Sequence, residues 1–67
     1  MNTSFIKIRM YQMGLTQGML AERIPTKEGK HISESALSNI LTGKTDPRKS
    51  TIDKIAKALG AESSQII

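Results

Sequence analysis

Apolar residues recur at helical spacing along most of the chain, and no segment alternates between apolar and polar residues at period two. The first such segment predicts an amphipathic helix over about residues 3–13. Its inward stripe is expected to consist of residues at three-residue steps, with two methionines alongside: Phe5, Ile8, Tyr11, Met10 and Met13. Gly14 follows and is expected to end this helix, because glycine can adopt the left-handed conformation of a helix C-cap.

Two short helices are predicted next. Thr16 can cap a helix over about 16–24, and Pro25 disfavours helical geometry at the residue before it. A polar segment without periodicity, about 25–33, then forms a turn that ends at Ser33, a plausible N-cap. The following helix, about 34–42, has an inward face of Leu37, Ile40 and Leu41.

The last third of the chain predicts a fourth helix and a short final element. Ser50 and Asp53 have the spacing of an imperfect capping box, and Gly60 follows the apolar side formed by Ile52, Ile55, Ala56 and Leu59. Ile66 and Ile67 are expected to pack back as a fragmentary fifth helix. The pattern predicts an all-α bundle that forms a single domain over residues 1–67.

Composition narrows the function classes. The chain has no cysteine, which excludes disulfides and thiolate metal sites and fits a reducing cytoplasm. Its longest apolar run is three residues, so neither a membrane-spanning helix nor a signal-peptide core is expected. The net charge of +4 makes nucleic acid a candidate partner, although the same excess would also keep a small domain soluble.

Catalytic chemistry has little support. His31 is the only histidine, the six carboxylates are scattered, and there is no glycine loop to hold phosphates. A metal ion needs three or four ligands, and nothing near His31 supplies them. We therefore expect no enzyme, metal or cofactor, and no small-molecule ligand is evident.

The helix at about 34–42 has short or polar residues on its outer face: Glu34, Ser35, Ser38 and Asn39. A helix of this kind can enter the major groove of DNA, which is about 12 Å wide, and bring hydrogen-bonding groups to the base edges.

A family resemblance extends over nearly the whole chain, from Phe5 to Ile66. The run LTQGMLAERI (15–24) resembles the opening of phage repressor and Cro-type (XRE-like) helix-turn-helix domains. LSNILTGK (37–44), followed by Pro47, and IAKALGA (55–61) resemble two later stretches of the same family. The resemblance implies the five-helix lambda-repressor-like DNA-binding fold, with the helix at about 34–42 as the recognition helix.

The sequence departs from the family pattern at three places. An internal Arg–Glu ion pair of the family is matched by Met10 and Leu41, a double replacement that a packed core tolerates. The turn between the second and third helices is enlarged by roughly six residues, Pro25 to Lys30, which loop-closure entropy penalises only slightly. Glu34 stands where Gln or Arg is frequent. It could accept a hydrogen bond from cytosine N4 or simply complement the dipole of its own helix.

The resemblance also assigns expected roles to residues. Asn39 is the first choice for contacting bases, followed by Ser35 and Glu34, while Ser38 could face a phosphate instead. The residues expected to contact phosphates are Gln17, Thr16, Lys44, Arg48, Lys49, Lys27 and Lys30, with His31 beside them. The residues expected to pack the motif are Leu20, Ala21, Ile24, Ile32, Leu37 and Ile40.

The expected function is a cytoplasmic, sequence-specific regulator of transcription that binds a double-stranded DNA operator. Repression of phage or mobile-element type is the default inference. A homodimer is expected on DNA, since one small domain contacts only a few base pairs, and the surfaces at 45–52 and at Ile66-Ile67 are candidates for its interface. The alternative is an antitoxin-type or restriction-modification controller protein whose main contact is another protein.

Overall fold

The computed structural model describes residues 1–26 and 29–67. Within them lie four α-helices: α1 (Thr3–Met13), α2 (Gln17–Glu22), α3 (Glu34–Leu41) and α4 (Lys49–Ala58). The fifth element is a single 3-10 turn, η2 (Ser63–Gln65), so the described residues confirm an all-helical domain but contain no fifth α-helix. None of the described helices combines the length and the apolar character needed to cross a bilayer.

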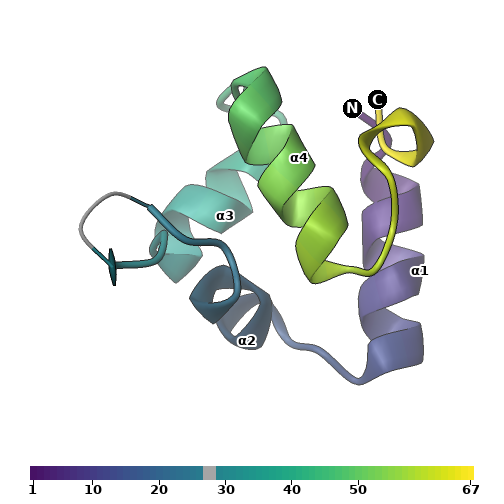
Figure 1. Cartoon of the computed structure of the whole chain (residues 1–67), viewed down its shortest axis with the longest axis horizontal. Coiled ribbons are helices and arrows are strands. Elements are labelled where there is room, and N and C mark those ends of the chain that lie inside the picture. Colours follow the sequence, from purple (N-terminus) through teal and green to yellow (C-terminus); the bar gives the residue numbers. More distant parts are fainter. Residues whose placement is uncertain (27–28) are drawn as a thin grey trace.

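The helices surround one apolar core. Figure 1 shows α1 on one side of the molecule, α2 and α3 on the other, and α4 between them. Each α-helix contributes at least one buried side chain, and the largest fully buried ones in the described chain are Ile6, Leu20, Ile24, Leu37, Ile55, Leu59 and Ile66. Every buried residue in the described part of the chain is apolar, so the core is held together by hydrophobic burial.

The inward face of α1 differs from the predicted stripe. Ile6 and Met10 are buried, whereas Tyr11 is 88% exposed and Ile8 is 59% exposed. Ile8 is two residues from each of the buried side chains, which places it about 160° around the helix from them. The predicted stripe was right for Met10 and for Phe5, which is partly buried against the core, and wrong for Ile8, Tyr11 and Met13, because the side that faces the core is the one that holds Ile6 and Met10.

Met10 is buried, as expected for a residue that replaces one member of the family's internal ion pair. It is buried in the same cluster as Leu41, and both occupy the core where an ion pair was expected in the family. Burial of two apolar side chains leaves no uncompensated charge in the core.

The two chain ends meet beside α1. The Asn2 backbone amide donates to the Ile66 carbonyl at 2.6 Å, and Figure 1 shows both termini at the same side of the molecule. Ile66 is fully buried while Ile67 is 71% exposed. The expectation that both isoleucines pack back was therefore right for Ile66 only, and Ile66 is not available to a dimer interface at the chain end.

The start of α4 also differs from the prediction. Arg48 is its N-cap and makes no side-chain capping bond, so Ser50 lies inside the helix and the predicted capping box is absent. A capping box forms instead at η2, where the Glu62 amide donates to Gln65 Oε1 at 2.9 Å. Pairs of residues at capping-box spacing occur by chance, and only a pair located where the backbone enters a helix can form a capping box.

Candidate nucleic-acid interface

The helix α3 has two chemically different faces. Leu37, Ile40 and Leu41 are buried in the core. Ser35 and Asn39 are exposed on the opposite side and Ser38 is half-buried, whereas Glu34 is exposed at the edge of the buried face, three residues before Leu37. The core thus fixes one side of α3, and the opposite side presents hydroxyl and carboxamide groups to a partner.

Hydrogen bonds define both ends of α3. At its start the Ser33 hydroxyl accepts from the Ala36 amide at 3.0 Å, as an N-cap does. At its end the Thr42 hydroxyl donates to the Ser38 carbonyl at 2.9 Å. The first bond satisfies an amide that the helix itself leaves without a partner, and the second adds to the bond at 3.0 Å from the Thr42 amide to the same Ser38 carbonyl.

The backbone of Asn39 holds the loop that follows α3. Its carbonyl accepts from the Lys44 amide at 2.9 Å and from the Thr45 amide at 3.2 Å. Gly43, with a φ of +81°, allows the chain to fold back for these bonds. Asn39 and Lys44, which the sequence assigned to bases and phosphates respectively, therefore keep a fixed separation.

The helix α2 lies against α3. Its N-cap is Thr16, whose hydroxyl accepts from the Met19 amide at 3.2 Å, and Gln17 is its first residue and half-buried. A Cβ atom at Gly18 would lie 2.8 Å from Glu34 Oε2, so the carboxylate of Glu34 packs close to the α2 backbone. The absence of a side chain at Gly18 is what permits this approach, and sequence analysis did not anticipate it.

Three exposed basic residues lie around the start of α4: Lys44, Arg48 and Lys49. Arg48 and Lys49 are the N-cap and the first residue of α4, while Lys44 is fixed to the end of α3 as described above. The structure thus places these three cations in the connection from α3 to α4 and at its junction with α4, the side of the motif on which phosphate contacts were expected.

In the connection between α2 and α3, the described residues before and after 27–28 are joined by backbone contacts. The Ile32 amide donates to the Ile24 carbonyl at 3.1 Å, the Thr26 amide donates to the Lys30 carbonyl at 2.6 Å, and Pro25 and His31 form an isolated antiparallel bridge. The His31 Nδ1 lies 2.8 Å from the Ile32 carbonyl, so this bond requires its hydrogen on that nitrogen. Lys30 and His31 are exposed, and Lys27 lies outside the described residues.

Comparison with known proteins decides the family. The model of a helix-turn-helix family matches residues 6–66, which is nearly the whole chain. The chain belongs to this helix-turn-helix family. No curated protein and no solved structure matches it significantly.

In this family, α2, the connection and α3 together form the helix-turn-helix motif. Membership of the family confirms the resemblance to phage repressor and Cro-type domains and makes the chain a DNA-binding domain of a transcription regulator. The residues predicted to pack the motif lie where the two helices meet. Leu20, Ala21, Ile24, Leu37 and Ile40 are buried, and Ile32 is partly buried against them.

Charged contacts elsewhere in the helix-turn-helix domain were not predicted. Arg9, on α1, donates from Nε to the Leu59 carbonyl at 2.9 Å and so bridges α1 to the end of α4. The sequence placed Arg9 outside the expected apolar stripe, but this position did not identify the Leu59 carbonyl as its partner. Within the described part of the chain no group of three His, Asp or Glu residues could hold a metal ion.

Proposed function

We propose that this helix-turn-helix protein binds a specific double-stranded DNA operator and that α3 enters the major groove. The main support for this proposal is that α3 has one buried apolar face and one exposed polar face. Its buried side fixes the helix in the domain, and its exposed side consists of short polar residues that fit the groove without obstruction. Eight residues at 1.5 Å each give a rod of about 12 Å, long enough to cover a few base pairs.

Asn39 is the residue we assign to base recognition. It is exposed on α3, and a carboxamide can make paired hydrogen bonds to N6 and N7 of adenine. Ser35 is the second candidate and lies one turn earlier on the helix. Glu34 is the third, and its position beside Gly18 keeps its carboxylate near α2, which ranks it below the other two. Ser38 is half-buried and fits a contact at the edge of the groove.

Phosphate contacts would hold the domain in register on the duplex. Gln17 and Thr16 stand at the start of α2, and Lys44, Arg48 and Lys49 stand between α3 and α4. The two groups flank α3 in sequence and belong to elements joined to it, so they can contact backbone on both sides of one groove. Lys27, Lys30 and His31 belong to the connection between α2 and α3 and would add a third contact.

Such a domain contacts few base pairs, so we propose that it acts as a homodimer on two half-sites one helical turn apart. Repression of a phage or mobile-element operator is the function that its motifs favour. The buried position of Ile66 leaves the surface around residues 45–52 as the better candidate for the dimer contact.

The test selects bound duplexes from a random pool, first with the protein and then with Asn39→Ala. We expect the variant to lose discrimination at one base position of each half-site by about 1–3 kcal/mol. The control is Gln12→Ala, which removes an exposed carboxamide from α1 and should leave the preferred sequence unchanged. An unchanged preference with Asn39→Ala would refute the assignment of Asn39.

Lys44→Ala tests the phosphate contacts. We expect weaker binding to all duplexes alike and a salt dependence reduced by about one unit of log–log slope. Lys7→Ala removes an equal charge from an exposed position on α1 and is the control. Binding that hardly changed with salt would contradict the proposal and favour the alternative function, a protein-interaction module of antitoxin or controller type.

A further inference from the structure

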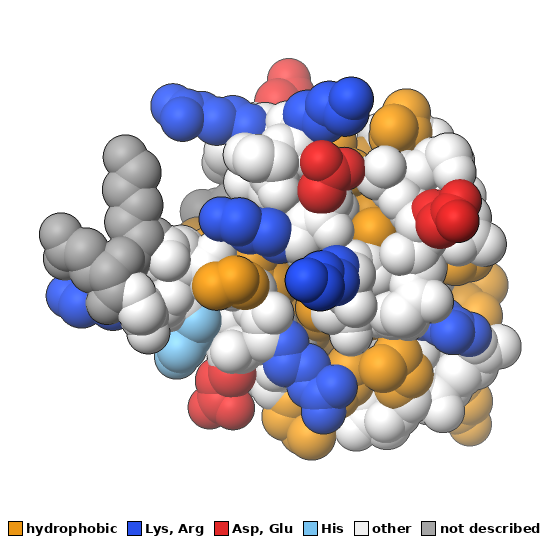
Figure 2. All heavy atoms as spheres, in the orientation of Figure 1, with side chains coloured by type: hydrophobic (Ala, Val, Ile, Leu, Met, Phe, Trp, Pro, Cys, Tyr) orange, Lys and Arg blue, Asp and Glu red, His pale blue; other side chains and the backbone are white. Residues whose placement is uncertain are grey.

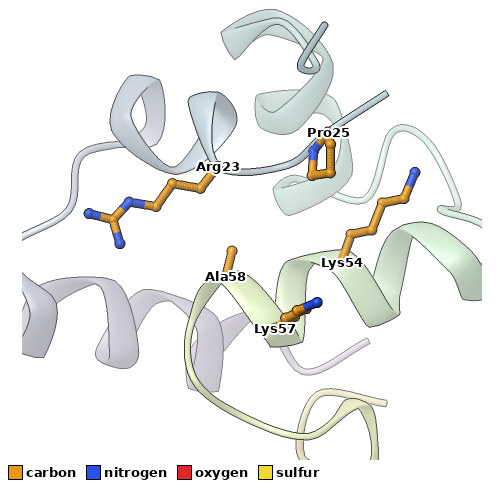
Figure 3. A pocket seen from close by; sticks show the side chains of 5 residues that line it. All are labelled: Arg23, Pro25, Lys54, Lys57 and Ala58. Carbon is orange, nitrogen blue, oxygen red and sulfur yellow. The ribbon is translucent and has the colours of Figure 1, made fainter. Parts of the chain in front are cut away.

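A cavity of about 400 Å³ opens between the end of α2 and the second half of α4. The described residues that line it are Arg23, Pro25, Lys54, Lys57 and Ala58. Figure 3 shows Arg23 extended to one side of it and Lys54 to the other, with Ala58 between them. Its volume lies at the lower end of the range of about 300–1,000 Å³ found for small-molecule sites.

Helical periodicity explains how α4 contributes to the cavity. Lys54, Lys57 and Ala58 are separated by three and four residues and therefore share one side of the helix. Ile55 and Ala56 lie on the other side and are buried in the core. The small side chain of Ala58 leaves space between the two lysines and the chain that follows α2.

The opposite wall comes from the end of the helix-turn-helix's first helix. Arg23 is the C-cap of α2, and Pro25 follows two residues later. The bridge from Pro25 to His31 and the bond between Ile32 and Ile24 tie this strand of chain in place. One wall of the cavity is thus positioned by the same backbone bonds that connect α2 to α3.

The cavity combines positive charge with an apolar floor. Of the described residues that line it, three are cations and none is a carboxylate. Pro25, Ala58 and the alkyl stems of the long side chains supply apolar surface. Figure 2 shows Lys and Arg side chains gathered over the middle of the face on which α4 lies. The charged ends of Arg23 and Lys54 point away from each other in Figure 3, and a multiply charged anion bound in the cavity would be attracted to all three cations and would reduce their mutual repulsion.

We propose that this cavity binds a small anion that carries a phosphoryl group on a compact apolar or aromatic body. A phosphoryl group has a charge of about −1.5 to −2 at neutral pH and can accept hydrogen bonds from several cations at once. The apolar body would lie on Pro25 and Ala58. The site would give this regulator a ligand that binds apart from its base-contacting helix.

The lining residues favour a small anion over the DNA backbone. Among the described residues, none that we assign to bases or phosphates lines the cavity. Its α4 wall lies in the half of that helix remote from Arg48 and Lys49. A duplex presents a row of phosphates and suits an extended basic surface, whereas this cavity is compact and has an apolar centre.

The test is a titration of the ¹⁵N-labelled protein with phenyl phosphate, followed by amide chemical shifts in the absence of DNA. We expect saturable shifts centred on Arg23, Lys54, Lys57 and Ala58, and much smaller ones with phenol or with inorganic phosphate alone. Lys57→Gln should weaken binding by about fivefold, the effect of one unit charge at about 4 Å in water. Lys7→Gln, which removes the same charge from α1, should have little effect.

A second variant separates shape from charge. Ala58→Leu keeps all three cations but occupies the place proposed for the apolar body of the ligand, and we expect it to lose phenyl phosphate binding while Lys57→Gln only weakens it. Shifts spread evenly over all basic residues, or equal losses with Lys7→Gln, would overturn the proposal in favour of general attraction of anions.

Two competition experiments address the other sources of negative charge. A duplex that displaces phenyl phosphate and shifts the same amides would overturn the proposal, because the cavity would then belong to the DNA-binding surface. A tetraglutamate peptide that binds the cavity more tightly than phenyl phosphate would overturn it as well and would indicate an acidic protein partner. Loss of the DNA function in other assays would leave the proposal unaffected, since the first titration contains no DNA.

Discussion

Ile66 stands next to the last residue of the chain and yet belongs to the core. Its side chain is 0% exposed, and its carbonyl accepts a hydrogen bond from the Asn2 amide at 2.6 Å. Ile67, immediately after it, is 71% exposed. The two isoleucines therefore form a matched pair with the same chemistry and different burial.

The expected loss of stability follows from this burial. Ile→Val in a packed core lowers the free energy of unfolding by about 0.5–1.5 kcal/mol, and Ile→Ala by about 2–5 kcal/mol. A domain of this length has a total stability of about 3–10 kcal/mol, so Ile66→Ala could remove most of it. Ile66→Val is the better variant for measurement, because it should remain folded.

The assay is thermal and urea unfolding followed by circular dichroism. In a domain of this size each kcal/mol corresponds to about 4–8 °C in Tm. Ile66→Val should lower Tm by several degrees, and Ile67→Val should change the free energy of unfolding by less than about 0.5 kcal/mol. Equal effects of the two substitutions would show that the last turn does not pack on the core in solution, and the reasoning would be refuted.

Two further predictions concern hydrogen bonds that fix the helices. Ser33→Ala should lower the free energy of unfolding by about 1 kcal/mol through loss of the N-cap of α3, and Ser35→Ala, at an exposed position two residues later, should lower it much less. A larger loss for Ser35→Ala than for Ser33→Ala in urea unfolding would contradict the capping role. Arg9→Met should lower the free energy of unfolding by about 1.5–3 kcal/mol, because it removes the charged donor to the Leu59 carbonyl. Lys7→Met, at an exposed position, should change it little, and equal Tm values for the two variants would argue against the bridge between α1 and α4.

The sequence alone was sufficient for the helices of the motif and for the family. Thr16 and Ser33 cap α2 and α3 as predicted, because an N-cap depends on local chain geometry and on a side-chain oxygen within three residues. The apolar residues of α3 face the core as predicted, because Leu37, Ile40 and Leu41 have an unambiguous helical spacing. The polar outer face of α3 follows from the same spacing.

The inward face of α1 and the start of α4 needed the tertiary structure. The first segment is apolar on more than one side, so spacing could not distinguish the buried Ile6 from the exposed Ile8 and Tyr11. The packing of α1 on the other helices made that choice. At α4 the chain enters the helix from Arg48, and this entry placed Ser50 inside it.

The sequence by itself determined the local features of this protein: where helices form, which caps start them and which family the motifs belong to. These features depend on residues a few positions apart, whose relation the chain fixes. The tertiary structure decided which residues distant in sequence meet, as Arg9 meets Leu59, Gly18 meets Glu34, and Arg23 comes to line one cavity with Lys54 and Lys57. Such meetings depend on how the helices pack as a group, and packing is set by the whole core at once.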